Sequence, residues 1–152
     1  CSIQPKTLPH VVKNVDSIVG VKEASGNIGS VAEIMHLCDG KLDLYSGNDD
    51  QVVPLLSLGG IGVISVLSNV APTYVHDMVM KYLSGDVQGS AKMQVDAIPL
   101  CNALFCEVNP IPVKAALNLM GKNVGPLRAP LTEIEDAHKE TLRQAMQDFG
   151  LL

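Results

Sequence analysis

Apolar positions along the first eighty residues recur at two different spacings. Runs rich in β-branched and apolar residues predict strands near residues 18–24, 42–46 and 62–66. Apolar residues at three-to-four spacing predict helices at about residues 5–15, 28–37, 50–58 and 72–84. Strands that alternate with helices favour a parallel sheet with right-handed crossovers, so the predicted fold class is α/β.

The chain beyond residue 85 shows helical patterns only. One long helix is expected from Val87 to Val108, kinked at Pro99 because a proline ring displaces the carbonyl one turn earlier. Asn109 is expected to cap a further helix that begins at Pro110. Thr132 and Glu135 have the spacing of a capping box, which predicts a last helix just after them.

Three strands are too few to close a barrel of the ordinary eight. Both outer strands of such a sheet would present unpaired backbone groups, which promote association with other chains. We therefore expect more chain, or a partner, to cover these edges. The first residue is Cys1 rather than Met, which indicates a processed chain or a piece of a longer one.

Composition narrows the class of protein. Of 152 residues, 47% are hydrophobic and 18% are charged, which is typical of a globular protein with a core. The formal net charge of −5 comes without a basic stripe, so no nucleic-acid partner is expected. No apolar run approaches the roughly 18 residues of a membrane span. A cytoplasmic enzyme is the expectation.

Sulfur and imidazole groups do not form a recognisable metal or disulfide pattern. The cysteines, expected to be small buried hydrophobic residues, are Cys1, Cys38, Cys101 and Cys106. His36 near Cys38 is a weak metal signal without a second ligand pair, so no metal site is expected. The methionines expected to fill the core are Met78, Met80, Met93, Met120 and Met146.

Lys22 interrupts an apolar strand and is the main candidate for chemistry. Because side chains alternate along a strand, Gly20 and Ala24 share the face of Lys22, whereas Val21 and Glu23 share the other. Small neighbours leave room for the lysine stem and a small ligand. An amine withdrawn from water has a lowered pKa, and its neutral form can attack a carbonyl to give a Schiff base.

A structural explanation of Lys22 stays open beside the chemical one. A lysine near a strand end can extend its amine to water, or pair with Glu23 or another acid.

Four motifs, taken together, resemble the dihydrodipicolinate synthase family of pyruvate-dependent class I aldolases. In order and spacing they are Gly20–Asn27, Ser46–Asp50, Gly59–Val66 and Asn109–Lys114. The resemblance extends along the chain but corresponds to the C-terminal half of a typical member. It implies a (β/α)8 TIM barrel followed by helices, with residues 1–84 as part of the barrel and 85–152 as the C-terminal helical region.

The resemblance also implies a reaction and a site. Family members condense pyruvate with aspartate semialdehyde to 4-hydroxy-tetrahydrodipicolinate, in lysine and diaminopimelate biosynthesis, without a cofactor. The lysine that forms the Schiff base corresponds to Lys22, and the positions that line the pyruvate pocket correspond to Gly47 and Ile64. The complete protein would be a homotetramer.

Other parts of the family's machinery have no counterpart in this chain. The Gly/Thr-rich loop, the tyrosines of the proton relay and the arginine that binds the second substrate belong to the other half. Tyr45, Tyr74 and Tyr82 do not match the relay positions. The alternatives are a sister aldolase, such as an N-acetylneuraminate lyase or a keto-deoxy-sugar acid aldolase, and a non-catalytic half-barrel that only associates.

Overall fold

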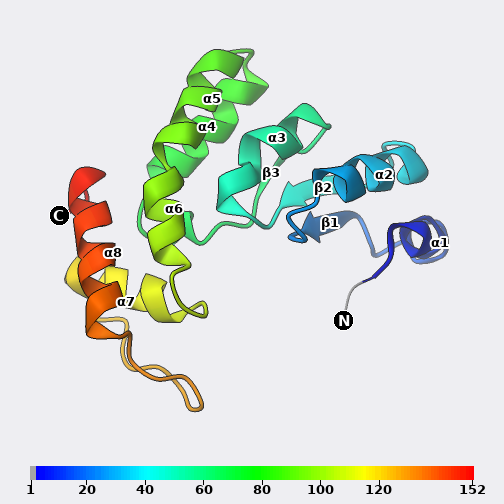
Figure 1. Ribbon diagram of the computed structural model, residues 1–152. Helices are drawn as coiled ribbons and strands as arrows, with labels where there is room; N and C mark the ends of the chain where they lie inside the picture. Colours follow the sequence, from blue (N-terminus) through cyan, green and yellow to red (C-terminus); the bar gives the residue numbers. More distant parts are fainter. Residues whose placement is uncertain (1–2) are drawn as a thin grey trace.

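The sheet is three-stranded and parallel, in the order β1 (Gly20–Glu23), β2 (Asp43–Ser46), β3 (Gly62–Val63). The computed structural model describes residues 3–152 (Figure 1). Lys22 of β1 lies opposite Tyr45 of β2, which in turn lies opposite Gly62 of β3. The predicted α/β class is confirmed, whereas β3 ends at Val63 and is shorter than predicted, because the N–H groups of Val66 and Leu67 bond to the Asp49 carboxylate and not to the backbone of β2.

Helices connect the strands as the sequence pattern predicted. In the first part of the chain they are α1 (Leu8–Asn14), α2 (Ile28–Cys38), α3 (Val52–Ser57) and α4 (Pro72–Leu83). Short 3-10 turns are η1 (Pro5–Thr7), η2 (Asp49–Gln51) and η3 (Leu67–Asn69).

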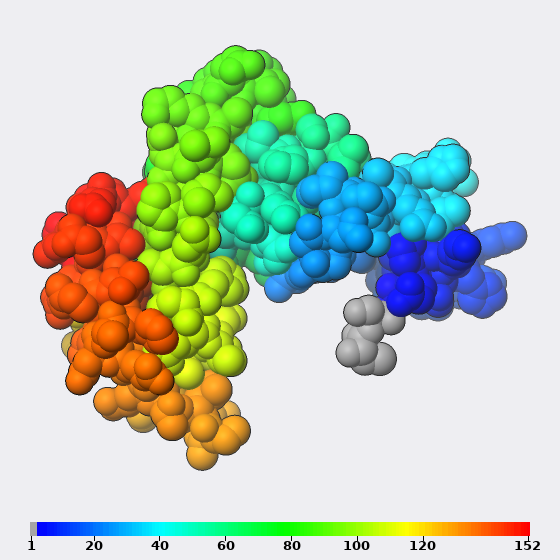
Figure 2. Space-filling view, viewed as in Figure 1, coloured from blue at the N-terminus to red at the C-terminus, as the bar shows by residue number. Residues whose placement is uncertain are grey.

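The two faces of the sheet have different surroundings. Val21 and Leu44 face α2 and α3, where they pack with Val31 and Leu55. The opposite face, here called the inner face, carries the exposed side chain of Lys22. In Figure 2 the molecule is hollowed along its lower margin, between the blue N-terminal part and the yellow-green segment of α6 and α7. Only one face of the sheet is therefore covered by the described residues.

The remaining helices form a layer beside the sheet. They are α5 (Val87–Asp96), α6 (Ile98–Leu104), α7 (Ile111–Leu119) and α8 (Asp136–Asp148). Leu100, Leu104, Leu142 and Met146 are buried together in the largest apolar cluster. The predicted break at Pro99 is confirmed, since α5 ends at Asp96 and α6 begins at Ile98, but α6 ends at Leu104 rather than at residue 108.

Most of the sulfur-containing side chains fill the core, as predicted. The methionines that are buried or packed against a buried cluster are Met78, Met93, Met120 and Met146. Met80 is wrong as a core residue, because it lies 47% exposed on α4. Cys38 and Cys101 are buried and Cys106 is half-buried, whereas Cys1 lies outside the described residues.

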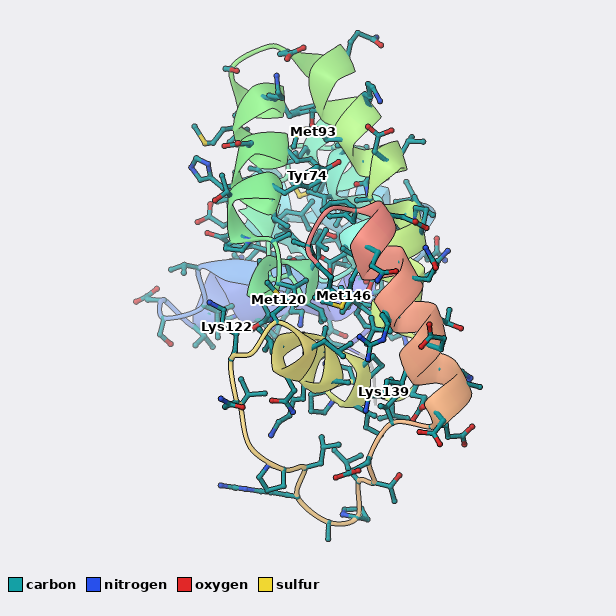
Figure 3. The ribbon with its side chains drawn as sticks, turned by 90° about the vertical axis from the view of Figure 1, so that its left-hand side faces the viewer. Tyr74, Met93, Met120, Lys122, Lys139 and Met146 are labelled. Atoms are coloured by element: carbon teal, nitrogen blue, oxygen red, sulfur yellow. The ribbon has the colours of Figure 1, made fainter. Side chains whose placement is uncertain are left out.

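Tyr74 joins α4 to the helical layer. Its hydroxyl donates a hydrogen bond of 2.8 Å to the carbonyl of Met93, and its ring meets the edge of Phe149 at a centroid distance of 4.8 Å. Figure 3 shows Tyr74 beneath Met93 and above Met120 and Met146. Tyr74 is thus a packing residue between helices.

Both predicted helix starts in this layer are wrong in detail. Helix α7 begins at Ile111, and the proline of its first turn is Pro112, so Asn109 does not cap it. Helix α8 begins at Asp136, its N-cap residue is Glu135, and this residue's side chain makes no capping hydrogen bond. The Glu135 N–H instead donates to Glu107 Oε1 at 2.9 Å, so a distant carboxylate replaces the predicted box.

Glu107 also binds an imidazole. Its Oε1 lies 2.8 Å from His138 Nδ1, on the first turns of α8. The hydrogen bond from the Glu135 backbone, followed by that with His138, lowers the pKa of Glu107 below its ordinary 4.5. The ionised form of Glu107 therefore holds the turn before α7 to the start of α8.

We predict that this contact makes the stability of the chain depend on acidic pH. Because the pKa of Glu107 is lower in the folded state, its stabilisation is present above about pH 4.5 and is lost as the pH falls through the folded-state value. The variant Glu107→Gln should melt below the unchanged chain near neutral pH, and the difference should shrink in acid. Thermal melts followed by circular dichroism across this range measure it.

The control is Glu140→Gln. Glu140 is also on α8, but it is exposed, and its pair with Arg143 at 3.5 Å lies on the surface, where an ion pair contributes little to stability. A melting difference for Glu107→Gln that stays constant across the pH range would contradict the prediction.

Candidate active site

Lys22 extends over the backbone of the neighbouring strand. A Cβ atom placed on Gly47 would lie 2.8 Å from Lys22 Cε and 2.5 Å from Ala24 Cβ. Lys22 and Ala24 therefore share the inner face, as the strand alternation predicted, and the missing side chain of Gly47 provides the space for the lysine stem. Gly47 also donates its N–H to the carbonyl of Glu23 at 2.7 Å, which fixes its backbone at the end of β1.

The amine of Lys22 is exposed and lacks an acidic partner within residues 3–152. The Glu23 carboxylate instead accepts the N–H of Ser25 at 3.1 Å, and the ion pairs of the described chain do not include Lys22. Pairing with Glu23 is thus not the reason for this lysine. The described residues also do not bury the amine, although the sequence predicts that it is withdrawn from water.

Tyr45 lies on the inner face next to Lys22. A Cβ on Gly20 would lie 3.6 Å from Tyr45 Cε2, and one on Gly62 would lie 3.4 Å from Tyr45 Cδ1. The ring is therefore flanked by a glycine on each neighbouring strand. Tyr45 matches no relay position of the family, but it lies opposite Lys22 and Gly62 in the register, and this placement brings it to the inner face.

Ile64 directly follows β3 and is 51% exposed. Its N–H donates to the carbonyl of Ser46 at 2.8 Å, one residue before Gly47. The structure thus brings Lys22 and Gly47 into contact and connects Ile64 to them through the backbone of β2.

Asp49 is a buried carboxylate in the segment between β2 and α3. Its Oδ2 accepts the N–H groups of Val66 at 2.8 Å and Leu67 at 2.9 Å, and so binds the segment after β3. It does not cap α3, which begins at Val52 without a side-chain cap.

A cavity of about 250 Å³ borders the loop between β2 and α3. Its lining includes Asp49, Asp50 and Cys101. Burial, and then the negative charges of Asp49 and Asp50, raise the pKa of Cys101 to about 12. This thiol therefore stays protonated at neutral pH and is not a nucleophile.

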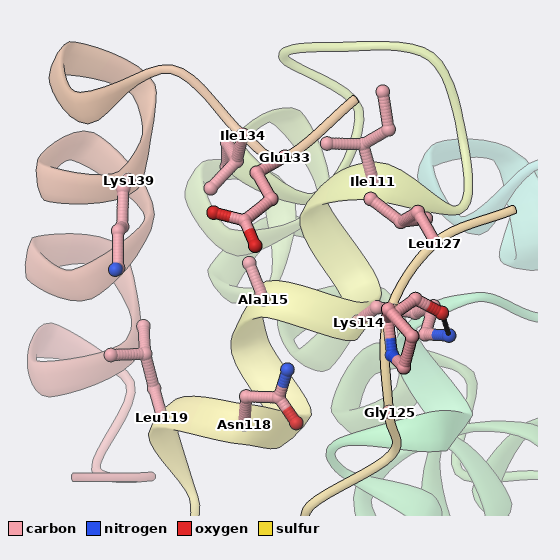
Figure 4. Close-up of a pocket in the computed structure, with 11 residues that line it drawn as sticks. Ile111, Lys114, Ala115, Asn118, Leu119, Gly125, Leu127, Glu133, Ile134 and Lys139 are labelled. Carbon is pink, nitrogen blue, oxygen red and sulfur yellow. Dashed lines mark hydrogen bonds between the residues drawn. The ribbon is translucent and has the colours of Figure 1, made fainter. Parts of the chain in front are cut away.

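A second cavity, of about 270 Å³, lies among α7, α8 and the segment that joins them (Figure 4). Apolar side chains such as Ile111 and Leu119 line it together with Glu133 and Lys139, and Lys114 donates to the carbonyl of Pro126 at 2.6 Å. None of its lining residues comes from a strand, so it is separate from the inner face.

Metal and membrane chemistry find no support in the described part of the chain. Among residues 3–152 no group of three or more His, Cys, Asp or Glu side chains is placed to hold a metal ion, and His36 and Cys38 belong to no such group. None of the described helices has the length and apolar character that crossing a bilayer requires.

Parallel strands with helices on one face and a lysine on the other define part of an α/β barrel whose inner face carries the candidate site. The comparison with family models supports the same class. The model of the dihydrodipicolinate synthetase family matches residues 1–149, and the chain belongs to this family.

Individual relatives agree with this assignment. The chain is 59% identical over 152 residues to the 4-hydroxy-tetrahydrodipicolinate synthase of Lachnoclostridium phytofermentans, covering all of this chain and 52% of that protein. The dihydrodipicolinate synthase of Thermotoga maritima superposes with a TM-score of 0.95 at 40% identity, over 99% of this chain and 52% of that one.

A third relative was solved with a ligand. The dihydrodipicolinate synthase of Acinetobacter baumannii, described as complexed with pyruvate, matches with a TM-score of 0.90 at 34% identity, over 97% of this chain and 50% of that one. The chain spans about half the length of the relatives it matches, which confirms the expected partial TIM barrel.

We predict that Gly47→Ala disturbs both the strand end and the lysine. The added methyl group would overlap Ala24 and the Lys22 stem, and overpacking of this kind costs about 1–3 kcal/mol. Urea unfolding of a chimera that joins the N-terminal half of the Lachnoclostridium phytofermentans relative to this chain measures the loss. The matched control is Gly62→Ala, whose methyl group would reach Tyr45 at an ordinary 3.4 Å. Equal stability of the two variants would show that Gly47 is not closely packed.

Proposed function

We propose that this chain carries the Schiff-base lysine of an enzyme that condenses pyruvate with aspartate semialdehyde to 4-hydroxy-tetrahydrodipicolinate. In this proposal Lys22 is the nucleophile, and Gly47 and Ile64 line the pyruvate pocket. The observation that carries it is the Lys22 stem lying over Gly47, with the amine on the inner face and without an ion-pair partner in the described chain. The relative described as complexed with pyruvate supports the choice of ligand.

The proposed reaction begins when the neutral Lys22 amine attacks the keto carbon of pyruvate. Loss of water gives an iminium, whose positive nitrogen accepts the electron pair left when the methyl group loses a proton. The resulting enamine attacks the aldehyde carbon of aspartate semialdehyde. Attack by the amine of the second substrate then closes the ring, and Lys22 is released. The iminium serves as the electron sink, so the steps need no cofactor.

The exposure of Lys22 indicates what the rest of the enzyme must contribute. In our proposal, residues 1–84 are part of the barrel, residues 85–152 are the C-terminal helical region, and the other half of the barrel pairs with the free edges of β1 and β3. That half would cover the amine, disfavour its charged form and supply proton transfer. The complete protein is proposed to be a cytoplasmic homotetramer.

We predict that pyruvate and borohydride together form a stable adduct on Lys22. The suitable protein is a chimera that joins the N-terminal half of the Lachnoclostridium phytofermentans relative to this chain, since that relative is 59% identical over the shared part. Lys22→Arg should abolish the adduct, because a guanidinium stays protonated and cannot form the imine. Peptide mass spectrometry locates the modified residue.

The control for this experiment is Lys92→Arg, since Lys92 pairs with Asp96 on the surface of α5. An adduct on another lysine, or one that survives Lys22→Arg, would contradict the role of Lys22. Discharge of the enamine by a sugar aldehyde but not by aspartate semialdehyde would instead assign the chain to a sister aldolase. No reaction with pyruvate at all would favour the non-catalytic half-barrel.

We also predict that the free sheet edges drive association. This chain alone should dimerise or aggregate, and the separately produced N-terminal half of the relative should bind it, because edge strands present unpaired backbone groups. Sedimentation velocity of each half and of the mixture measures this. A single monomeric species of this chain that ignores the other half would contradict the prediction.

A further inference from the structure

Asp49 connects β2 and β3 beyond the point where their backbone ladder ends. The last paired residues are Ser46 and Val63, and the Ile64 N–H adds one further bond to Ser46. After this the two chains separate. The Asp49 carboxylate then spans the gap, since its Oδ2 binds the N–H groups of Val66 and Leu67.

The position of this bridge relates it to the proposed pyruvate pocket. Asp49 follows Gly47 by two residues, and Val66 follows Ile64 by two residues. The carboxylate therefore fixes the two segments to each other just beyond each pocket residue. Without it, the hydrogen bond of the Ile64 N–H to Ser46 would be the remaining one between this segment and β2 among the described residues.

Asp49 is itself held rigidly. The residue is 2% exposed, and Oδ2 accepts both hydrogen bonds of the carboxylate, while Oδ1 is buried without a hydrogen-bond partner among residues 3–152. Gln94 of α5 donates to the Asp49 carbonyl at 2.8 Å and accepts the Val53 N–H at 3.1 Å. The bridge is thus supported from the helical layer as well as from the sheet.

We infer that Asp49 is a positioning residue, which sets the distance between Gly47 and Ile64 and so the affinity of the pocket for pyruvate. This inference rests on the proposed function. Asp49 does not need to touch the substrate, because its effect passes through the backbone that carries the two pocket residues. Its neighbour Asp50 is exposed and makes no such bridge, so it provides a matched comparison.

The test is the dependence of borohydride trapping on pyruvate concentration in the chimera. Asp49→Ala should raise the half-saturating pyruvate concentration about tenfold, as expected for loss of two charge-assisted hydrogen bonds, with a smaller change in the limiting rate. Asp49→Asn should restore the value to within about threefold, since its amide oxygen still accepts both N–H groups. Asp50→Ala should match the unchanged protein.

A second variant tests the inference in case Asp49→Ala does not fold. Gln94→Met keeps the carboxylate but removes its support from α5, so it should raise the half-saturating concentration less than Asp49→Ala does. Amide hydrogen exchange at Val66 and Leu67 should accelerate in both variants. If Asp49→Ala does not fold, Gln94→Met decides the question.

Each remaining outcome has a definite meaning. An adduct with the same pyruvate dependence in Asp49→Ala or, where that variant does not fold, in Gln94→Met overturns this inference alone. Asp49→Asn as impaired as Asp49→Ala, or Asp50→Ala equally impaired, also overturns it. Absence of any adduct in the unchanged chimera overturns the proposed function and this inference with it.

Discussion

A parallel strand must place neighbouring side chains on opposite faces, and in β1 this alternation decides where the lysine lies. Leu44 is buried beneath α2 and α3 with its partner Val21 half-buried beside it, and fully burying a side chain such as Leu44 stabilises a fold by about 1.5–3 kcal/mol. Lys22 and Tyr45 are consequently held on the inner face. A slip of one residue would exchange the apolar and the charged side chains, so core packing itself fixes the orientation of Lys22.

Small residues and buried polar bridges shape the surroundings of that lysine. Gly47 leaves space for its stem, and the glycines beside Tyr45 let the aromatic ring lie along the sheet. Behind them, Asp49 and Gln94 connect the ends of β2 and β3 to α5. The helical layer therefore supports the strand ends through direct hydrogen bonds.

Local patterns predicted the sheet, most helices and the face of Lys22, because alternation and helical periodicity depend on neighbouring residues. The start of α8 could not be predicted in this way, since Glu107 reaches it from 28 positions earlier in the chain. The role of Asp49 likewise depends on a partner 17 positions away. The solvent exposure of Lys22 agrees with one of the two alternatives that the sequence left open, because the pattern predicts an apolar strand but not which residues cover it.

Competitive amine labelling tests the central claim most directly. The claim is that the inner face around Lys22 is open in this chain and is covered by the other half of the barrel. Lys22 should acylate as readily as the exposed Lys92 in this chain alone. When the N-terminal half of the relative binds, labelling of Lys22 should fall sharply while that of Lys92 stays constant. Binding of the two halves with unchanged labelling of Lys22 would contradict the claim.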